Sequence, residues 1–485
     1  MFTRRHALQS AACGFGYLAL AGLAHADQVP LSSPGRGGRG EGASTRENPL
    51  APKPSHHAPK AKRVIFLFMQ GGPSQVDTFD YKPQLAQRDG QQMPFDDART
   101  IANTGQRQSN QRIMKPLWKF SQHGQSGRQV SALFPHVAKH VDDLCFLHGL
   151  HTEGVAHGPA TLFLHTGSTN MIRPSMGSWI TYGLGTENAN LPGFVTIAPS
   201  PGNGGARNYG NAFLPSVYQG TALGTAGGST DKMVFKHLAN KHYSMGEQEQ
   251  FLGLLGQLNA EQLARQPGDK ELEAVVQSYE LAWRMQQQAP DVLDLRRETP
   301  ETLALYGIGQ KETDDFGRQC LMARRLCEAG VRFIQVTHGD ASANPKWDQH
   351  SNLAKHADHA KSVDQPIAGL LTDLKRRGLL DDTLIWWGGE FGRTPYAEKN
   401  GSGRDHNPGG FTVWLAGAGV KPGFAFGATD DFGHHAIRDK VHMHDLHATI
   451  LHLLGLDHEK LTFQYAGRPF RLTDVHGRVV REIIG

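Results

Sequence analysis

The sequence predicts an α/β fold with a mostly parallel central sheet and helices on both faces. Short, continuous apolar runs recur along the chain, and each ends abruptly at glycine or at a polar residue. Helical stretches separate or follow these runs, and buried strands that alternate with helices form parallel sheets covered on both faces. The 485 residues fit one large domain with an insertion, or two domains. The hydrophobic fraction of 38% is too high for a disordered chain.

Residues 1–26 have the pattern of an export signal. Arg4 and Arg5 form a twin-arginine pair, an apolar stretch follows from Ala11 to Leu23, and Ala24-His25-Ala26 is an A-x-A cleavage site. The stretch is too short and wrongly flanked for a stable membrane span, and no other run is long and apolar enough for one. We therefore expect export through the twin-arginine pathway, to the periplasm or the cell exterior. An ordinary secretory signal that happens to contain Arg-Arg is the alternative.

Residues 27–62 are expected to form a flexible, basic linker, because they are rich in glycine, proline and serine and lack a periodic apolar pattern. Of the formal net charge of +4, the signal holds +2 and the linker +3, which leaves −1 for residues 63–485. A chain whose main domain is nearly neutral gives no electrostatic reason to expect nucleic acid as a partner.

Residues 63–485 contain the predicted strands and helices. The apolar runs predict strands at Arg63–Met69, Val331–Thr337, Thr383–Trp387 and Phe411–Leu415. Helical stretches are expected at Asp314–Ala329, Asn352–Arg377 and Leu446–Leu454, and Gly455 stops the last one. Residues 199–300 differ from the rest: they are loop-rich to about Thr230 and helical from Phe251 to Gln287, which predicts a helical insertion or cap.

Three cysteines remain after the signal: Cys145, Cys320 and Cys327. Cys320 and Cys327 are seven residues apart in a predicted helix, which separates them by roughly 10 Å. Such a distance is too long for a disulfide, so the chain is not a disulfide scaffold.

Histidine is unusually frequent, with 26 residues, and several acidic and histidine side chains lie at strand ends. Asp348 and His350 follow the second predicted strand, Glu390 follows the third, and His406 precedes the fourth. Side chains just past the carboxyl ends of parallel strands line the ligand crevice of such sheets. Since carboxylate and imidazole suit Zn²⁺ and similar divalent ions, we expect a metal site or a polar catalytic site here.

Arg393 and Arg404 lie in the same segments, in GGEFGRTP and GRDHNPGG. Their planar guanidinium groups suit phosphate, sulfate or carboxylate, and a salt bridge to a nearby acid is the alternative for each. Catalytic motifs of other classes, such as G-x-S-x-G, the Walker loop and the Rossmann glycine motif, are absent from the sequence.

Two further groups of residues are expected mainly to pack. The first is a dense histidine group, which could bind metal but has a favoured structural interpretation: His434, His435, His442, His444 and His447. The second consists of Trp347, Trp386 and Trp387, which could bind a sugar or another polymer but lie in or beside predicted core strands.

Taken together, the motifs resemble those of an exported bacterial family called "domain of unknown function 1501". The matching segments are MQGGPSQVDTFDYKP, WDQH, LLDDTLIWWGGEFGRTP, GRDHNPGG, GATDDFG and HDLHATILHLLG. The resemblance covers the chain from about Arg63 to its end, together with the twin-arginine start. It implies the α/β/α sandwich of the alkaline phosphatase and sulfatase superfamily, with residues 199–300 as the helical insertion.

The resemblance also implies two metal subsites. Asp348, His350 and His406 would belong to one, and Glu390 to the second. The sequence departs from the superfamily pattern at Gln70, where an Asp is usual, and at Phe391, where a His often follows the carboxylate.

The expected function is a secreted, metal-dependent hydrolase of phosphate or sulfate esters, in small molecules or polymers, with a divalent metal such as Zn²⁺. The resemblance implies that His157 occupies the place of the nucleophile, and Arg393 and Arg404 would balance substrate charge. Ser74 or Thr161 as nucleophile, a water activated by the metal, and a phosphohistidine at His157 remain open. The alternative function is a catalytically degenerate member of the same fold that acts as a binding or scaffold protein in the envelope.

Overall fold

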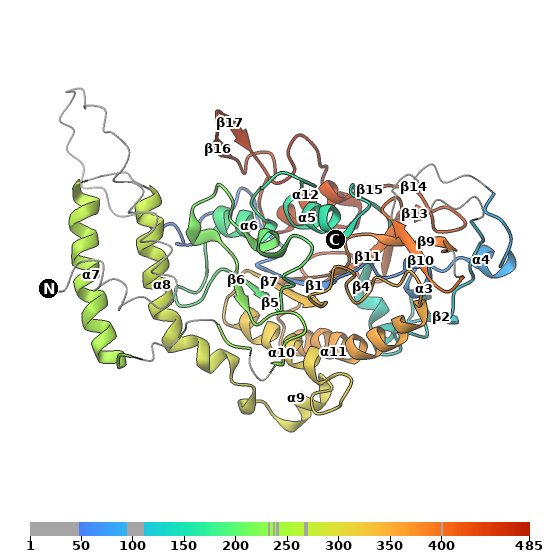
Figure 1. The fold of residues 1–485 in the computed structure, drawn as a ribbon, viewed down its shortest axis with the longest axis horizontal. Coiled ribbons are helices and arrows are strands. Elements are labelled where there is room, and N and C mark those ends of the chain that lie inside the picture. Colours follow the sequence, from blue (N-terminus) through green and yellow to red (C-terminus); the bar gives the residue numbers. More distant parts are fainter. Residues whose placement is uncertain are drawn as a thin grey trace.

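The computed structural model describes residues 48–94, 111–230, 233–235, 238, 242–265, 270–398 and 401–485. These residues form a large sheet with helices on both faces (Figure 1). The predicted export signal and linker residues 27–47 lie outside the described residues. Among the helices of the described ranges, none combines the length and the apolar character that a membrane span requires.

The central sheet has nine strands, and its main path runs β12-β4-β11-β8-β1-β7-β5-β6, with β15 also paired to β4. All neighbours are parallel except β11, which is antiparallel to both β8 and β4. The prediction of an α/β fold with a mostly parallel sheet is therefore confirmed. The strands are β1 (Arg63–Met69), β4 (Leu144–His151), β5 (Phe194–Ile197), β6 (Thr221–Leu223), β7 (Phe333–His338), β8 (Thr383–Gly388), β11 (Phe411–Ala416), β12 (Phe424–Phe426) and β15 (Val441–His442).

Two helical layers cover the sheet. Helices α5 (His157–Thr166), α6 (Met176–Leu184) and α12 (Met443–Leu453) lie on one side, and α10 (Asp314–Glu328) and α11 (His356–Arg376) lie on the other (Figure 1). On the first side, His165 of α5 packs against Phe68 of β1, with 5.1 Å between the ring centroids. On the second side, Phe316 of α10 packs against His338 of β7, with 5.3 Å between the centroids.

Continuous burial explains why the central strands read as unbroken apolar runs. Every residue of β7, β8 and β11 is buried, because helices or neighbouring segments cover both faces. Shorter elements complete the described fold: α3 (Gln75–Thr78), α4 (Pro83–Gln87), α9 (Pro300–Leu305) and the two-stranded pairs β2 (Phe120–His123) with β3 (Arg128–Ser131), β9 (Gly392–Ala397) with β10 (Arg404–Asn407), β13 (Ala428–Thr429) with β14 (Ala436–Arg438), and β16 (Phe463–Tyr465) with β17 (Arg468–Phe470).

The expectation of a flexible linker as far as Lys62 is wrong for residues 48–62. Leu50 is buried, Lys53 Nζ donates to Tyr182 O at 2.8 Å, and the backbone N–H of His56 donates to Gly455 O at 2.8 Å. These specific contacts fix the segment on the domain. Sequence reasoning missed them because only isolated apolar residues anchor the segment.

The predicted insertion contains two long helices, α7 (Met245–Arg265) and α8 (Lys270–Leu293), which stand side by side at one end of the molecule (Figure 1). The segment is not purely an insertion, because it also supplies β6, which pairs in parallel with β5 at the edge of the main sheet. The three cysteines of the described residues, Cys145, Cys320 and Cys327, are free and buried, which agrees with the predicted lack of disulfides.

A tight turn after β1 lets a distant loop approach the edge of the sheet. Gly71 and Gly72 adopt positive φ angles of 114° and 71°. A Cβ atom on Gly71 would lie 2.6 Å from the backbone nitrogen of Asp348 and 2.8 Å from that of Trp347. Glycine is therefore required at this position if the loop that carries Asp348 is to contact the strand end.

Candidate metal centre

Side chains from several separate elements gather at the carboxyl-terminal edge of the sheet. His157 is the first residue of α5, and Asp348 and His350 lie in the loop between β7 and α11. Glu390 follows β8, and His406 belongs to β10. The elements therefore bring together residues that are 249 positions apart in the chain, as the topology of a parallel sheet predicts.

Asp348 lies at the centre of the group. Its Oδ1 is 2.8 Å from His350 Nε2 and 3.2 Å from His406 Nε2, and its Oδ2 is 3.2 Å from His157 Nε2. The Nε2 atoms of His350 and His406 are 3.0 Å apart. One ligand atom from each of these four residues lies within 4.8 Å of all the others, which makes them a group able to hold a metal ion.

The opposite nitrogen of each imidazole is bound by an acceptor. His406 Nδ1 lies 2.7 Å from the carbonyl oxygen of Val155, and His157 Nδ1 lies 2.6 Å from Glu390 Oε1. His350 Nδ1 contacts Glu398 Oε1. Because carbonyl and carboxylate oxygens only accept hydrogen bonds, these contacts place a proton on Nδ1 of each ring and turn Nε2 toward Asp348.

Positive charge, from protons or from a metal ion, would stabilise this arrangement. Three Nε2 lone pairs and a carboxylate are all acceptors, and they repel one another unless protons or a metal ion lie between them. The formal charges of Asp348, Glu390, Glu398 and Arg393 leave −2, which a divalent ion would balance. Ligand atoms around Zn²⁺ at about 2.0–2.2 Å would stand roughly 3.3–3.6 Å apart. Here the contacts of the imidazoles with the Asp348 oxygens are 2.8–3.2 Å, and the four ligand atoms lie within 4.8 Å of one another.

Two of the three imidazoles favour positive charge, whereas burial lowers the pKa of His406 to about 4. Burial lowers the pKa of His350, but Asp348 and Glu398 outweigh burial and raise that pKa to about 9. Burial opposes protonation of His157 too, yet its contacts with Asp348 and Glu390 leave its pKa raised. Burial would raise the pKa of Asp348, but Arg393 and the three imidazoles hold it well below its usual range.

The group opens to solvent on the side of His350. The side chain of His350 is 25% exposed, whereas that of Asp348 is 1% exposed. Asp405 lies at this opening, with its Oδ1 3.7 Å from His350 Nδ1. A ligand would therefore reach the group past His350.

The sequence profile of a family described as "Protein of unknown function (DUF1501)" matches residues 61–484. The chain belongs to the DUF1501 family. The resemblance seen in the sequence motifs is thereby confirmed. No sequence among the curated proteins matches this DUF1501 chain.

Several solved structures are similar to this DUF1501 protein in chain path. One is the PsFucS1 sulfatase from Pseudoalteromonas sp., with 12% identity and a TM-score of 0.36, covering 82% of this chain and 68% of that one. Another is the lipoteichoic acid synthase LtaP from Listeria monocytogenes, with 10% identity and a TM-score of 0.35, covering 87% and 78%. A third is the alkaline phosphatase from the Antarctic bacterium TAB5, with 10% identity and a TM-score of 0.30, covering 76% and 94%. Similarities this weak assign neither an activity nor a site residue to this chain.

Among the predicted metal ligands of the DUF1501 protein, Asp348, His350 and His406 come together, and His157 joins them. Glu390 lies behind His157 instead of facing the centre. Its two oxygens accept the backbone N–H of Gly71 at 3.0 and 3.1 Å, and Oε1 also binds His157 Nδ1. The structure therefore gives Glu390 the position of a residue that orients an imidazole.

The two arginines do not have the expected substrate-facing position. Both are fully buried, and every nitrogen of each guanidinium group donates to a protein acceptor. Arg393 Nη2 donates to Asp348 Oδ1 at 2.7 Å, and Arg404 Nε donates to Asp77 Oδ2 at 2.7 Å. Arg393 therefore positions Asp348, and Arg404 forms an ion pair in the core; the expectation that they balance substrate charge is corrected.

None of the candidate nucleophiles is poised to attack. Both ring nitrogens of His157 face carboxylates, which opposes a phosphohistidine at this residue. Ser74 is buried and donates to Asp77 Oδ2 at 2.5 Å, and Thr161 is fully buried. Of the alternatives considered from the sequence, activation of water by a metal fits this geometry best.

Gln70 and Phe391, which depart from the superfamily pattern, do not contribute ligands to the group. The side-chain amide of Gln70 is buried and has no hydrogen-bond partner among the residues that the structure describes. The Phe391 ring packs against the rings of His406 and His157, with centroid distances of 4.4 and 5.0 Å. An apolar ring therefore occupies the side of the group where a second set of ligands was expected.

The tryptophans expected to pack are buried, as are His434, His444 and His447, whereas His435 is exposed. Trp347, Trp386 and Trp387 are at most 1% exposed, which excludes them as a surface for sugars or polymers. In the dense histidine group of residues 434–447, the ring of His442 accepts from the backbone N–H of His444 and caps α12. His447 Nε2 donates to Leu164 O at 2.9 Å.

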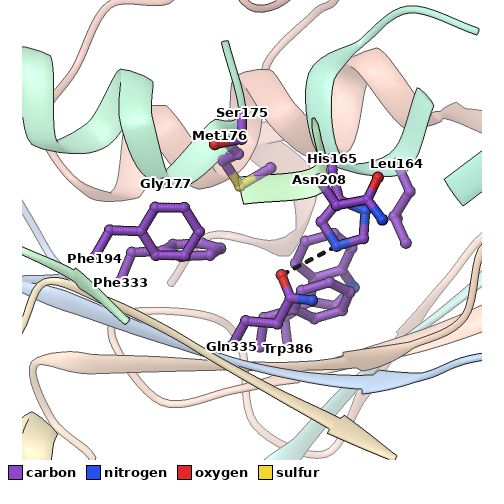
Figure 2. A pocket seen from close by; sticks show the side chains of 11 residues that line it. Leu164, His165, Ser175, Met176, Gly177, Phe194, Asn208, Phe333, Gln335 and Trp386 are labelled. Atoms are coloured by element: carbon purple, nitrogen blue, oxygen red, sulfur yellow. Dashed lines mark hydrogen bonds between the residues drawn. The ribbon is translucent and has the colours of Figure 1, made fainter. Parts of the chain in front are cut away.

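A small cavity lies elsewhere, between the sheet and helices α5 and α6 (Figure 2). Aromatic and aliphatic side chains form most of its wall, and two of its polar members, His165 and Gln335, bind each other at 3.0 Å. None of the predicted site residues lines it. We regard this cavity as a packing void in the core.

Sequence reasoning missed Glu398 and the carbonyl of Val155, which bind the outer nitrogens of two imidazoles. Glu398 follows β9 and reaches His350 only because β9 pairs with β10 and the loop before α11 lies beside them. No spacing motif marks such a residue, and a backbone carbonyl leaves no trace in a sequence.

Proposed function

We propose that this DUF1501 protein is a metal-dependent hydrolase of phosphate or sulfate esters, with one divalent ion, such as Zn²⁺, held by His157, Asp348, His350 and His406. The observation that carries the proposal is the convergence of three Nε2 atoms on one carboxylate while every Nδ1 is bound by an acceptor. Metal-binding imidazoles have this arrangement, because an acceptor at the outer nitrogen fixes the tautomer and orients the ring.

A bound divalent ion would act as a Lewis acid, polarising the ester and lowering the pKa of a water molecule. The protein's residues prepare the site for this chemistry. Glu390 and Glu398 hold the protons of His157 and His350 on Nδ1, and Arg393 orients Asp348. The Phe391 ring, packed on His157 and His406, excludes water from one side.

The test is hydrolysis by the purified, Zn²⁺-loaded protein of aryl phosphate monoesters, aryl phosphate diesters and aryl sulfates. We expect turnover of at least one class, its loss on treatment with a chelator, and its recovery on addition of Zn²⁺. His406→Ala should abolish turnover, whereas His123→Ala, which changes a histidine on β2 outside the group, should leave it intact.

Zn²⁺-loaded protein that hydrolyses none of the three ester classes would count against the hydrolase and favour a second candidate, a binding or scaffold protein that kept the metal site. The burial of both arginines and the engagement of Ser74 favour this candidate, since neither an anion clamp nor a poised hydroxyl borders the group in the described structure. It predicts that His406→Ala leaves the role of the protein in the cell unchanged.

We also propose that the twin-arginine signal exports the protein to the periplasm or the exterior after it has folded. A protein sent by this route is able to acquire its metal in the cytoplasm. Replacement of Arg4 and Arg5 by lysine should retain the protein in the cytoplasm, as fractionation and immunoblotting would show; unchanged export would contradict this route.

A further inference from the structure

Trp347, the residue before Asp348, is anchored on the face of the sheet opposite α5. It is completely buried, and its indole Nε1–H donates to His338 Nδ1 at 3.0 Å. Its backbone N–H donates to Gln70 O at 3.1 Å. The side chain of Trp347 thus fixes the start of the segment that carries Asp348 and His350.

His338 belongs to β7 and is held in one tautomer by its neighbours. An indole is a donor only, so Nδ1 of His338 must be unprotonated and Nε2 must carry the proton. His338 Nε2 lies 3.0 Å from Ser362 Oγ, and the Ser362 hydroxyl donates to the carbonyl of His359 at 2.7 Å. The hydrogen bonds therefore run in one direction, from Trp347 through His338 and Ser362 to the backbone of α11.

The chain of hydrogen bonds is isolated from solvent. His338 is 5% exposed, and burial together with Lys346 and His359 holds its pKa well below the usual value, so that the ring stays neutral. The neutral ring of His338 accepts a hydrogen bond at Nδ1 and donates one at Nε2. It therefore joins the indole to α11 without leaving either of its buried nitrogens unpaired.

We propose that His338 is a positioning residue of the metal centre: by accepting the indole N–H of Trp347 it sets the place of Asp348 and thereby the affinity of the site for its metal. The proposal rests on the proposed metal-dependent function. His338 and Trp347 contribute no atom to the group of four ligands, so the effect is transmitted through the backbone between Trp347 and Asp348.

The test is the dissociation constant for Zn²⁺, measured by competition with a chelator on full-length protein. His338→Phe keeps the ring volume but removes the acceptor, and it should weaken Zn²⁺ binding by about 10–100-fold. His338→Asn places an amide oxygen near the position of Nδ1, and it should restore an affinity close to that of the unchanged protein. Binding of Co²⁺ should report the same change as a shifted visible absorption spectrum in His338→Phe alone.

The matched control is His359→Phe. His359 also borders Trp347, with 5.5 Å between the ring centroids, but the indole N–H binds His338 instead. This variant should bind Zn²⁺ normally. Should His338→Phe fail to fold, Ser362→Ala is milder: it frees the far end of His338 and should weaken binding in the same direction by a smaller factor.

Equal Zn²⁺ affinity in His338→Phe and in the unchanged protein would overturn the positioning role and leave the metal site standing. So would an equal loss in His359→Phe, because general packing would then explain both variants. Absence of Zn²⁺ binding in the unchanged protein would overturn the proposed function together with this inference.

Discussion

Glu390 and Glu398 each bind the outer nitrogen of an imidazole whose inner nitrogen faces Asp348. A carboxylate in this position raises the basicity of the ring and fixes its direction. Both carboxylates therefore belong to the proposed metal centre, although neither has a ligand atom among the four that converge.

Glu390→Gln tests this role at a single residue. The amide keeps the shape and an acceptor oxygen but loses the negative charge, so we expect Zn²⁺ affinity to fall by about 10–100-fold. Chelator competition measures it, and Glu398→Gln is the matched change at His350. Unchanged affinity in both variants would show that the outer contacts serve packing alone.

Residue identity in the site was partly predictable from the sequence. Asp348, His350 and His406 could be predicted as site residues because side chains at the carboxyl ends of parallel strands generally line the ligand site. The position of Glu390 behind His157 was not predictable, since it depends on where the first turn of α5 lies above β8. The burial of Arg393 and Arg404 could not be predicted either, because a sequence does not show which acceptors surround a guanidinium group.

Arg404 joins several elements around the site. Its guanidinium group, which is fully buried, donates to Asp77 of α3, to the carbonyl of Thr394 in β9 and to the carbonyl of Met114. A buried charge with several acceptors is costly to leave half-paired. The β9–β10 pair that carries His406 is thereby fixed to α3.

Arg404→Met should destabilise the protein by about 3–5 kcal/mol, because Asp77 then remains buried without its partner. Urea unfolding followed by circular dichroism measures the change. Adding Asp77→Asn to Arg404→Met removes the unpaired negative charge of Asp77 and should recover part of the lost stability. A double variant less stable than Arg404→Met would contradict the ion-pair account.

α12 contacts α5 through His447, whose Nε2–H donates to Leu164 O. Burial lowers the pKa of His447 to about 4, so the folded state takes up a proton less readily than the unfolded chain does. The contribution of the neutral His447 side chain to stability is therefore fully present above about pH 6.5, the ordinary pKa of histidine in the unfolded chain. This contribution is lost as the pH falls toward 4.

His447→Gln retains a donor toward Leu164 O but cannot be protonated. The free energy of unfolding of the unchanged protein should decrease between pH 7.5 and pH 5 by up to about 2 kcal/mol more than that of the variant. Urea unfolding at the two pH values gives this difference. Identical pH dependence in both proteins would show that His447 does not titrate on unfolding.

At the level of elements, the strands predicted from apolar runs were found with small shifts in their ends, whereas β4, β5, β6, β12 and β15 of the central sheet were missed. β4 contains two histidines and a glycine in LCFLHGLH, so its composition resembles a loop although six of its eight residues are buried. β6 has three residues, and only its partner β5 makes it a strand. Pairing in the sheet, rather than local preference, decides these elements.

For the whole molecule, a metal site that unites α5, the β7–α11 loop and β10 should couple metal binding to stability. A ligand that binds only the folded state stabilises it by about 2.7 kcal/mol at a free concentration one hundred times its dissociation constant. We therefore expect Zn²⁺ to raise the melting temperature and a chelator to lower it in differential scanning fluorimetry. The same melting temperature under both conditions would contradict this coupling.

The metal content of the purified protein, determined by inductively coupled plasma mass spectrometry, tests the central claim most directly. After reconstitution with Zn²⁺ and removal of excess ion, we expect about one ion per chain in the unchanged protein. The double variant His350→Ala/His406→Ala should be folded and nearly free of metal. An unchanged protein without bound metal, or a double variant that retains one ion per chain, would contradict the account.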